Sequence, residues 1–331
     1  MLKGRNAVNS DINQPWEQDN QAWWDWYVTL ADNPRKIEAS DLVDLSPIPN
    51  CDMASDDQIE NELSDLYHVT KHQCIAFRRD GFIKLPNVLS QGAVARLRHE
   101  IIELLRKSFD LSSNYGVNNR FLSLELLWLT NKLLRRYVLS PRIAKICSDL
   151  LGGKSVRLYH DNILVKEPGC GRTPWHCDDH HFPLATQDVV TAWIPAQPIP
   201  VLMGPLAFAK PLSVFNLVKN IKFNKFDTSY DKLINKTFDR NNVEIENKAF
   251  AMGEVSFHHN RSFHTANGNK TSRMRVVLAN TYFANGSRVV DQPTLVSGDW
   301  QKFIPGVDPG GIADSRLNPI CWPINADTKA Q

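Results

Sequence analysis

Residues 156–166 read VRLYHDNILVK, and the turn sequence PGCG follows at 168–171. β-Branched and aromatic side chains ahead of a Pro-Gly turn predict a β-strand with a sharp exit. Further short runs of this kind follow at residues 188–197, 205–211, 253–259 and 275–284. Several short strands separated by Gly and Pro turns are typical of a sandwich or jelly roll, and they argue against a parallel α/β sheet.

Two helical regions are expected before these strands. Residues 90–109 carry apolar side chains at helical spacing from Val94 to Leu105, and Ser90 is a candidate N-cap. A second helical region is expected over roughly 122 to 151, with the Gly-Gly pair at 152–153 as its stop signal. Each region has one apolar stripe, so the expected fold class is mainly β with flanking helices (α+β).

Composition divides the chain into three parts. Residues 1–70 are polar and acidic and form an expected N-terminal extension packed on the core. Its aromatic cluster is interpreted either as an anchor to the main body or as a binding surface; the cluster comprises Trp23, Trp24, Trp26 and Tyr27. Residues 71–320 are the expected main domain, with 321–331 as a C-terminal tail. The polar insertion at 212–250 is expected to be a lid or a disordered segment.

Charge and hydropathy exclude several classes of protein. The 331 residues include 38 Lys and Arg and 36 Asp and Glu, a formal net charge of +2, so no nucleic-acid partner is expected. No apolar run reaches the about 18 residues of a membrane span. The N-terminal sequence lacks the apolar core of a secretory signal, which predicts a cytoplasmic protein without a membrane partner. The six cysteines show no CxxC pair and are expected to be reduced.

The sequence Trp175-His176-Cys177-Asp178 is the strongest local signal for chemistry. In a strand, side chains at positions i and i+2 lie on the same face, so His176 and Asp178 would point together into a barrel. An imidazole and a carboxylate on one face, completed by a distant histidine, form a site that holds iron(II) and leaves coordination positions open. His264, at an expected strand end, is the candidate second histidine.

Two arginines, Arg273 and Arg275, open the strand expected after His264. 2-Oxoglutarate chelates iron through its keto group and near carboxylate, so its far carboxylate needs a cationic clamp deeper in the barrel. Both arginines share a face if the segment is extended, and only one need contact this cosubstrate. We interpret Arg273 as structural and Arg275 as the clamp.

Four segments in order resemble the core of the phytanoyl-CoA dioxygenase family. These segments are NILVKEP (162–168), WHCDDHHFP (175–183), DVVTAWIPA (188–196) and GPLAFAKP (204–211). Residues 80–101 resemble the family's N-terminal signature and residues 299–319 its ending, so the resemblance covers about 75 to 320. It implies a double-stranded β-helix (a jelly-roll, cupin-like barrel) that uses iron(II), 2-oxoglutarate and dioxygen.

The resemblance implies specific roles for residues of this chain. It makes His176, Asp178 and His264 the iron ligands and assigns the cosubstrate clamp to Arg275, which lies eleven positions after His264. Trp193 matches a tryptophan that lines the cosubstrate pocket.

The resemblance also implies roles for three further residues, which match the family's motifs less closely. Asn162 falls where a pocket-facing strand residue lies, and Lys132 aligns with a lysine near the cosubstrate. The family often has Ser or Thr two residues after the distal histidine, whereas this chain has Ala266 there with Thr265 beside it. Thr265 is therefore the candidate for that cosubstrate hydrogen bond.

The predicted reaction is hydroxylation of an unactivated C–H bond in a small metabolite or natural-product intermediate, with release of succinate and CO2. Desaturation, cyclisation and epimerisation start from the same hydrogen abstraction and stay open. A non-catalytic cupin-like metal-binding protein and a zinc hydrolase with the same ligands also stay open. Most of the neighbouring histidines are interpreted as outer or surface residues: His180, His181, His258 and His259. The expected partner is a small-molecule substrate, and the oligomeric state is left open.

Overall fold

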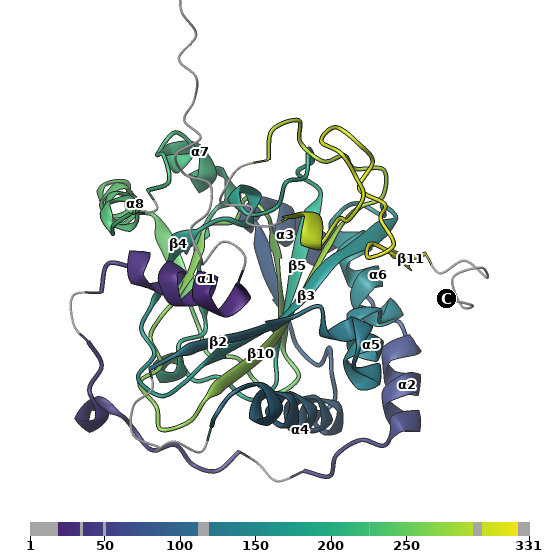
Figure 1. The fold of residues 1–331 in the computed structure, drawn as a ribbon, viewed down its shortest axis with the longest axis horizontal. Helices are drawn as coiled ribbons and strands as arrows, with labels where there is room; N and C mark the ends of the chain where they lie inside the picture. Colours follow the sequence, from purple (N-terminus) through teal and green to yellow (C-terminus); the bar gives the residue numbers. More distant parts are fainter. Residues whose placement is uncertain are drawn as a thin grey trace, which may run out of the picture.

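The computed structural model describes residues 19–33, 36–48, 51–111, 119–224, 226–293 and 300–323. Two antiparallel sheets form its frame (Figure 1). The larger has seven strands in the order β1-β8-β5-β10-β3-β11, with β2 also paired to β3, and the smaller has the order β4-β9-β6-β7. The strands are β1 Phe82–Leu85, β2 Phe121–Glu125, β3 Val156–Lys166, β4 Thr173–His176, β5 Val189–Pro195, β6 Leu206–Lys210, β7 Glu244–Asn247, β8 Val255–His259, β9 His264–Ala266, β10 Arg275–Ala284 and β11 Ile320–Trp322.

Helices cover the outer face of the larger sheet, which Figure 1 shows around β3 and β10. They are α2 Asp56–Ser64, α3 Lys71–Asp80, α4 Gln91–Ser108, α5 Lys132–Val138 and α6 Pro141–Leu150. The α4 helix begins as predicted, because the Ser90 hydroxyl accepts a hydrogen bond of 3.1 Å from the amide of Ala93. Its apolar stripe from Val94 to Leu105 is buried against the sheet.

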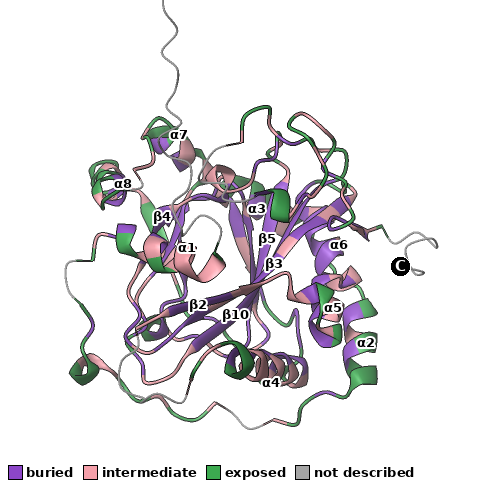
Figure 2. Cartoon of the chain, in the orientation of Figure 1, coloured by how far each residue is buried: buried purple, intermediate pink, exposed green. Residues whose placement is uncertain are grey.

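The central strand β10 has no exposed residue, because both of its faces are covered (Figure 2). Val276 and Leu278 face the helices, whereas Val277 and Ala279 belong to a second apolar cluster inside the barrel. Alternate residues of β10 therefore pack either against the helices or into the inside of the barrel. The predicted mainly-β fold with flanking helices is confirmed, as are the strands expected around residues 156–166, 188–197, 205–211, 253–259 and 275–284.

The helical prediction over 122 to 151 is wrong at its start. Phe121–Glu125 is strand β2, which pairs with β3 along the edge of the larger sheet. The run is rich in leucine, which favours a helix locally, but pairing with a neighbouring strand overrides that preference. Helices α5 and α6 follow, and the stop at residues 152–153 is confirmed by positive φ angles of 81° and 85°.

Two predicted boundaries are also corrected. The insertion expected at 212–250 contains α7 (Phe215–Val218) and α8 (Ser229–Arg240), but it ends in β7, which pairs with β6 and belongs to the barrel. The expected tail at 321–331 begins inside β11, which pairs with β3. Neither pairing is visible locally, because both strands are short and their partners lie far away in the sequence.

The N-terminal helix α1 (Asn20–Tyr27) crosses the open end of the barrel, as Figure 1 shows in front of β2 and β4. Its Gln21 side chain donates to the carbonyl of Phe121 at 2.6 Å and accepts from the amide of Ser123 at 3.1 Å. These bonds satisfy the free edge of β2 in the way that another strand would. Within the described residues, the helices are too short or too polar to span a membrane.

Candidate metal centre

The two candidate histidines face each other across neighbouring strands of the smaller sheet. His176 is the last residue of β4 and His264 the first of β9, and the two are register partners. Asp178 lies beyond the strand, at the first residue of a 3-10 turn (Asp178–His180), so the prediction of one continuous strand is corrected. Because Cys177 between them is extended, His176 and Asp178 still point the same way. The ligand atoms of the three residues lie within 4.8 Å of one another.

Both histidines have their tautomer fixed by the backbone. Nδ1 of His176 lies 2.8 Å from the carbonyl of Pro174, and Nδ1 of His264 lies 3.0 Å from that of Ser262. A carbonyl only accepts, so each Nδ1 carries the proton and each Nε2 keeps its lone pair. Burial lowers the pKa of His176 to about 3 and that of His264 to about 4, so both are neutral at pH 7.

Asp178 is held in the charged form and in one orientation. Its Oδ2 accepts from the Thr191 hydroxyl at 2.9 Å and lies 3.2 Å from Nε2 of His258. Burial alone would raise the pKa of this carboxyl, but the hydrogen bond from His258 holds it well below its usual range. Oδ1 is turned toward His264, 3.8 Å from its Nε2. Because Nε2 of His258 must donate to the carboxylate, it has no lone pair for a metal.

These donors fit a ferrous ion. Two imidazole lone pairs and one carboxylate oxygen form the set that non-heme iron takes on three positions. The other atoms of each group are already bonded to protein, which is how metal ligands are usually held in place. His176, Asp178 and His264 would hold the ion.

Arg275 is a buried cation without an anionic partner. It is 1% exposed at the start of β10, and its Nη1 donates to the carbonyl of Gly204 at 2.9 Å. Its Nε has no partner, and no carboxylate of the described residues forms an ion pair with it. Burial lowers the pKa of Arg275 to about 10, which leaves it charged at pH 7. Because an unpaired buried charge is costly, this guanidinium calls for an anionic ligand.

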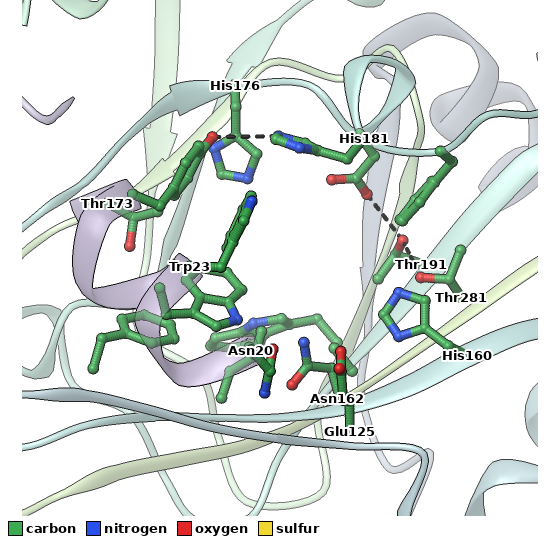
Figure 3. A pocket seen from close by; sticks show the side chains of 18 of the residues that line it. Asn20, Trp23, Glu125, His160, Asn162, Thr173, His176, His181, Thr191 and Thr281 are labelled. Atoms are coloured by element: carbon green, nitrogen blue, oxygen red, sulfur yellow. Dashed lines mark hydrogen bonds between the residues drawn. The ribbon is translucent and has the colours of Figure 1, made fainter. Parts of the chain in front are cut away.

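One cavity joins the metal ligands to Arg275. Figure 3 shows His176 and Asn162 among the side chains around it. Trp193 and Asn162 line it too; the Trp193 ring lies 5.5 Å from the Arg275 guanidinium, and Asn162 accepts from Ser123 at 2.7 Å. The structure therefore brings together six of the eight predicted site residues: His176, Asp178, His264, Arg275, Trp193 and Asn162.

Two predicted cosubstrate contacts are corrected. Lys132 is exposed at the start of α5 and does not line the cavity. Thr265 points away from it, because His264 and Ala266 on either side take the inward face of β9. The Thr265 hydroxyl instead donates to the carbonyl of Thr173 at 2.6 Å and accepts from Arg172 at 3.0 Å.

Sequence reasoning missed several lining residues. His258 was interpreted among outer histidines, yet it is 2% exposed and lines the cavity beside Asp178. The inward alternation of β8 could have indicated it. On α1, Trp23 and Tyr27 also line the cavity, and their spacing of four residues places them on one helix face. Arg273 is structural as predicted, because its guanidinium donates to the carbonyl of Ser46 at 2.6 Å.

Comparison with known proteins gives the family. The family model described as phytanoyl-CoA dioxygenase (PhyH) matches residues 77–277. The chain belongs to the PhyH family. The human peroxisomal phytanoyl-CoA dioxygenase is 21% identical over 258 residues, which cover 72% of this chain and 75% of that protein. This PhyH member therefore shares most of its length with a curated relative.

Solved structures share the fold of this PhyH protein. The carbocyclase SnoK from nogalamycin biosynthesis is 24% identical, with a TM-score of 0.62 over 76% of this chain and 96% of SnoK. EctD from S. alaskensis, with 2-oxoglutarate and 5-hydroxyectoine, is 19% identical, with a TM-score of 0.56 over 82% of this chain and 98% of EctD. At these identities the likeness establishes the barrel architecture alone.

Proposed function

We propose that this PhyH protein is an iron(II)- and 2-oxoglutarate-dependent dioxygenase that hydroxylates an unactivated C–H bond of a small molecule. The observation that carries the proposal is the pairing, in one cavity, of a His-Asp-His donor set with an unpaired buried arginine. A metal-binding protein without a cosubstrate has no use for a buried cation at that place.

Each part of the site has a separate task. His176, Asp178 and His264 would hold iron(II), which would supply the activation of dioxygen with 2-oxoglutarate as the two-electron donor. Arg275 holds the far carboxylate of the cosubstrate, and Trp193 packs beside that guanidinium. The overall balance is one C–H substrate, one dioxygen and one 2-oxoglutarate to one alcohol, one succinate and one CO2.

The family relation supports the oxygenase class more strongly than the reaction type. SnoK is named as a carbocyclase and SnoN as an epimerase, and both share this fold. Cyclisation, desaturation or epimerisation would use the same ligands and the same Arg275. Product analysis by mass spectrometry separates them, because only hydroxylation adds one oxygen atom to the substrate.

Succinate release tests the proposal. The purified chain is incubated with iron(II), ascorbate and 2-oxoglutarate, and we expect succinate to form slowly without substrate. Arg275→Gln should lower this rate about 10- to 100-fold at limiting cosubstrate, since it removes a charge-assisted contact. Arg273→Gln, the same change outside the cavity, should match the wild type.

Two outcomes would overturn the proposal. An intact iron site with no succinate under any substrate would favour a non-catalytic metal-binding protein. Tight zinc binding with no affinity for 2-oxoglutarate would favour a hydrolase on the same ligands.

A further inference from the structure

Aromatic rings form two walls of the cavity, and one of these rings, Phe121, also lies 5.9 Å from the Arg275 guanidinium. One wall comes from α1 and the adjoining strand β2, and its residues are Trp23, Trp24, Tyr27 and Phe121. The other comes from β3 and two loops, and its residues are Tyr159, His160, Phe182 and Phe303. Figure 3 shows Trp23 and His160 on opposite sides of the hollow, with His176 at one end and Glu125 at the other.

The rings of each wall are fixed by stacking on one another. The Trp24 ring stacks on Phe121 with centroids 4.3 Å apart, and Trp23 stacks on Tyr27 at 4.6 Å. On the far side, His160 stacks on Phe303 at 4.6 Å. Because their partners hold them, these rings offer preformed flat faces to a ligand.

Aliphatic lining is confined to the other part of the cavity. Leu206, Ala266 and Ala279 belong to the apolar cluster that contains Trp193, and Leu164 packs against that cluster. This is the side near Arg275, which the proposed cosubstrate takes. Of the described residues that line the ring-walled part, none is Leu, Ile, Val or Met. An alkyl chain placed there would meet rings and polar side chains but no aliphatic side chain of the described residues.

The charged side chains that face the ring-walled part already have partners. Lys302 forms an ion pair with Glu125, and the Asp19 carboxylate caps α1 by accepting from the amide of Ala22 at 2.6 Å. Among the described lining residues, Arg275 is the only other Lys or Arg. Apart from Arg275, which the proposed cosubstrate takes, the described part of this cavity offers no unpaired cation to the phosphates of an acyl-CoA.

One polar atom in the ring walls lacks a partner. Tyr159 lines the cavity, and its hydroxyl is buried and has no hydrogen bond. Tyr159 reaches the cavity because the pairing of β3 with β10 shifts register between Thr281 and Tyr282, which re-aims the strand residues there. A buried hydroxyl without a partner is costly, so a ligand that bonds to it would be favoured.

We propose that the substrate is an uncharged, flat, ring-bearing molecule with a hydroxyl or carbonyl group, held between the two aromatic walls. This inference rests on the proposed function, because the metal and the cosubstrate take the rest of the cavity. The Tyr159 hydroxyl bonds to the polar group of the substrate. Trp23 stacks on its ring, which presents a ring edge or substituent toward His176.

A matched pair of small molecules tests the inference. 2-Naphthol and decahydro-2-naphthol share a carbon skeleton and a hydroxyl, but only the first is flat and aromatic. Calorimetric titration into the full chain with iron(II) and 2-oxoglutarate under argon should give at least about tenfold tighter binding of 2-naphthol. Dodecanoyl-CoA should show no binding. Equal binding of the two alcohols, or tighter binding of dodecanoyl-CoA, would overturn the inference.

Variants locate the binding between the walls. Trp23→Leu keeps an apolar side chain but removes the ring, and should weaken 2-naphthol about 2- to 10-fold. Tyr159→Phe removes only the hydroxyl and should weaken it by a similar factor while leaving 2-methylnaphthalene unchanged. The control is Trp26→Leu, the same change on the same helix at a residue that does not line the cavity. Losses no larger than in this control would overturn the inference.

The affinity for 2-oxoglutarate separates this failure from that of the proposed function. In each variant it should equal the wild-type value, which also shows that the variant is folded. If wild-type protein binds 2-oxoglutarate but does not discriminate between the two alcohols, only the substrate class is wrong. If it fails to bind 2-oxoglutarate, the proposed function is wrong.

Discussion

The hydroxyl of Thr191 donates a hydrogen bond of 2.9 Å to Oδ2 of Asp178. A hydroxyl has one proton, so in the 3.0 Å contact between Thr191 and Thr281 the donor must be Thr281. Thr281 therefore donates to Thr191, which donates to the carboxylate of Asp178. These bonds fix which oxygen of Asp178 faces the metal position.

Thr191→Val tests this orientation, because it keeps the shape of the side chain and removes the donor. We expect iron(II) affinity to fall about 10- to 100-fold, as is usual when a partner that orients a ligand is lost. Thr191→Ser keeps the hydroxyl and should retain most of the affinity. Anaerobic competition with a coloured iron(II) chelator measures both. Equal affinity of the valine variant and the wild type would refute the role of Thr191.

Arg275→Met tests whether Arg275 binds a ligand and does not stabilise the fold. The variant should lose measurable 2-oxoglutarate binding in calorimetry, because no cation remains for the far carboxylate. Its melting temperature without ligands should be no lower than that of the wild type, since a buried unpaired charge is replaced by an apolar group. A strongly lowered melting temperature would mean that Arg275 is structural.

Acidification should destabilise the metal-free protein between about pH 6.5 and pH 4. Burial lowers the pKa of His176 to about 3 and the pKa values of His264 and His259 to about 4. In this window the unfolded chain binds protons at these histidines and the folded chain does not. The free energy of unfolding therefore falls by about 1.4 kcal/mol per pH unit for each histidine.

One carboxyl acts in the opposite direction. Burial raises the pKa of Asp161 to about 7, so the folded chain holds its proton in the same window and one histidine is offset. Asp178 has a lowered pKa in the folded chain, so its charged form contributes stability that is lost only below about pH 4. Urea unfolding at pH 6.5, 5.5 and 4.5 measures the net slope, and His259→Asn should make it shallower. Stability that stays flat, or rises on acidification, would contradict the buried neutral histidines.

Asp231→Ala tests whether helix α8 is a fixed part of the site. The carboxylate of Asp231 is fully buried; it pairs with Arg172 and accepts from the amides of Trp175 and Asp32, each at 2.7 Å. Removing it leaves the half-buried Arg172 and two backbone amides without their partner, so we expect a loss of about 3–5 kcal/mol in the free energy of unfolding.

Limited proteolysis measures the same contact locally. Wild-type α8 should resist cleavage, and Asp231→Ala should be cut within residues 226–248. Rapid cleavage of the wild type in that range would instead fit the mobile lid that the sequence allowed.

The barrel and its donor set could be predicted because their signals are local or carried by an ordered motif. Strand β3 shows its character in its own residues, and His176 and Asp178 are two residues apart. Lys166 shows where this reasoning stops. It looks like a solvated strand end, yet it is fully buried and donates to three carbonyls, of Gly171, Ala266 and Asn267, at 2.8 to 2.9 Å. Contacts between residues that are far apart in the sequence leave no pattern in the residues around either one.

The position of α1 lay outside prediction for the same reason. Of the two interpretations of the tryptophan cluster, the structure supports the anchor, because Trp24 stacks on Phe121. Trp23 lines the cavity, so a role in binding stays a prediction. Which residues of α1 contact the barrel depends on how α1 covers the edge of β2. The sequence did not indicate that edge, because the helix predicted over roughly 122 to 151 overlaps β2.

Anaerobic titration of the iron(II)-loaded protein with 2-oxoglutarate, followed by visible absorption, tests the central claim most directly. A chelate of ferrous iron with a 2-oxo acid absorbs visible light, so we expect a band that saturates at one cosubstrate per chain. His264→Ala should abolish the band, and Arg275→Gln should require about 10- to 100-fold more cosubstrate to reach it. A wild-type protein that binds iron(II) but gives no such band, or a band unchanged in His264→Ala, would contradict the account.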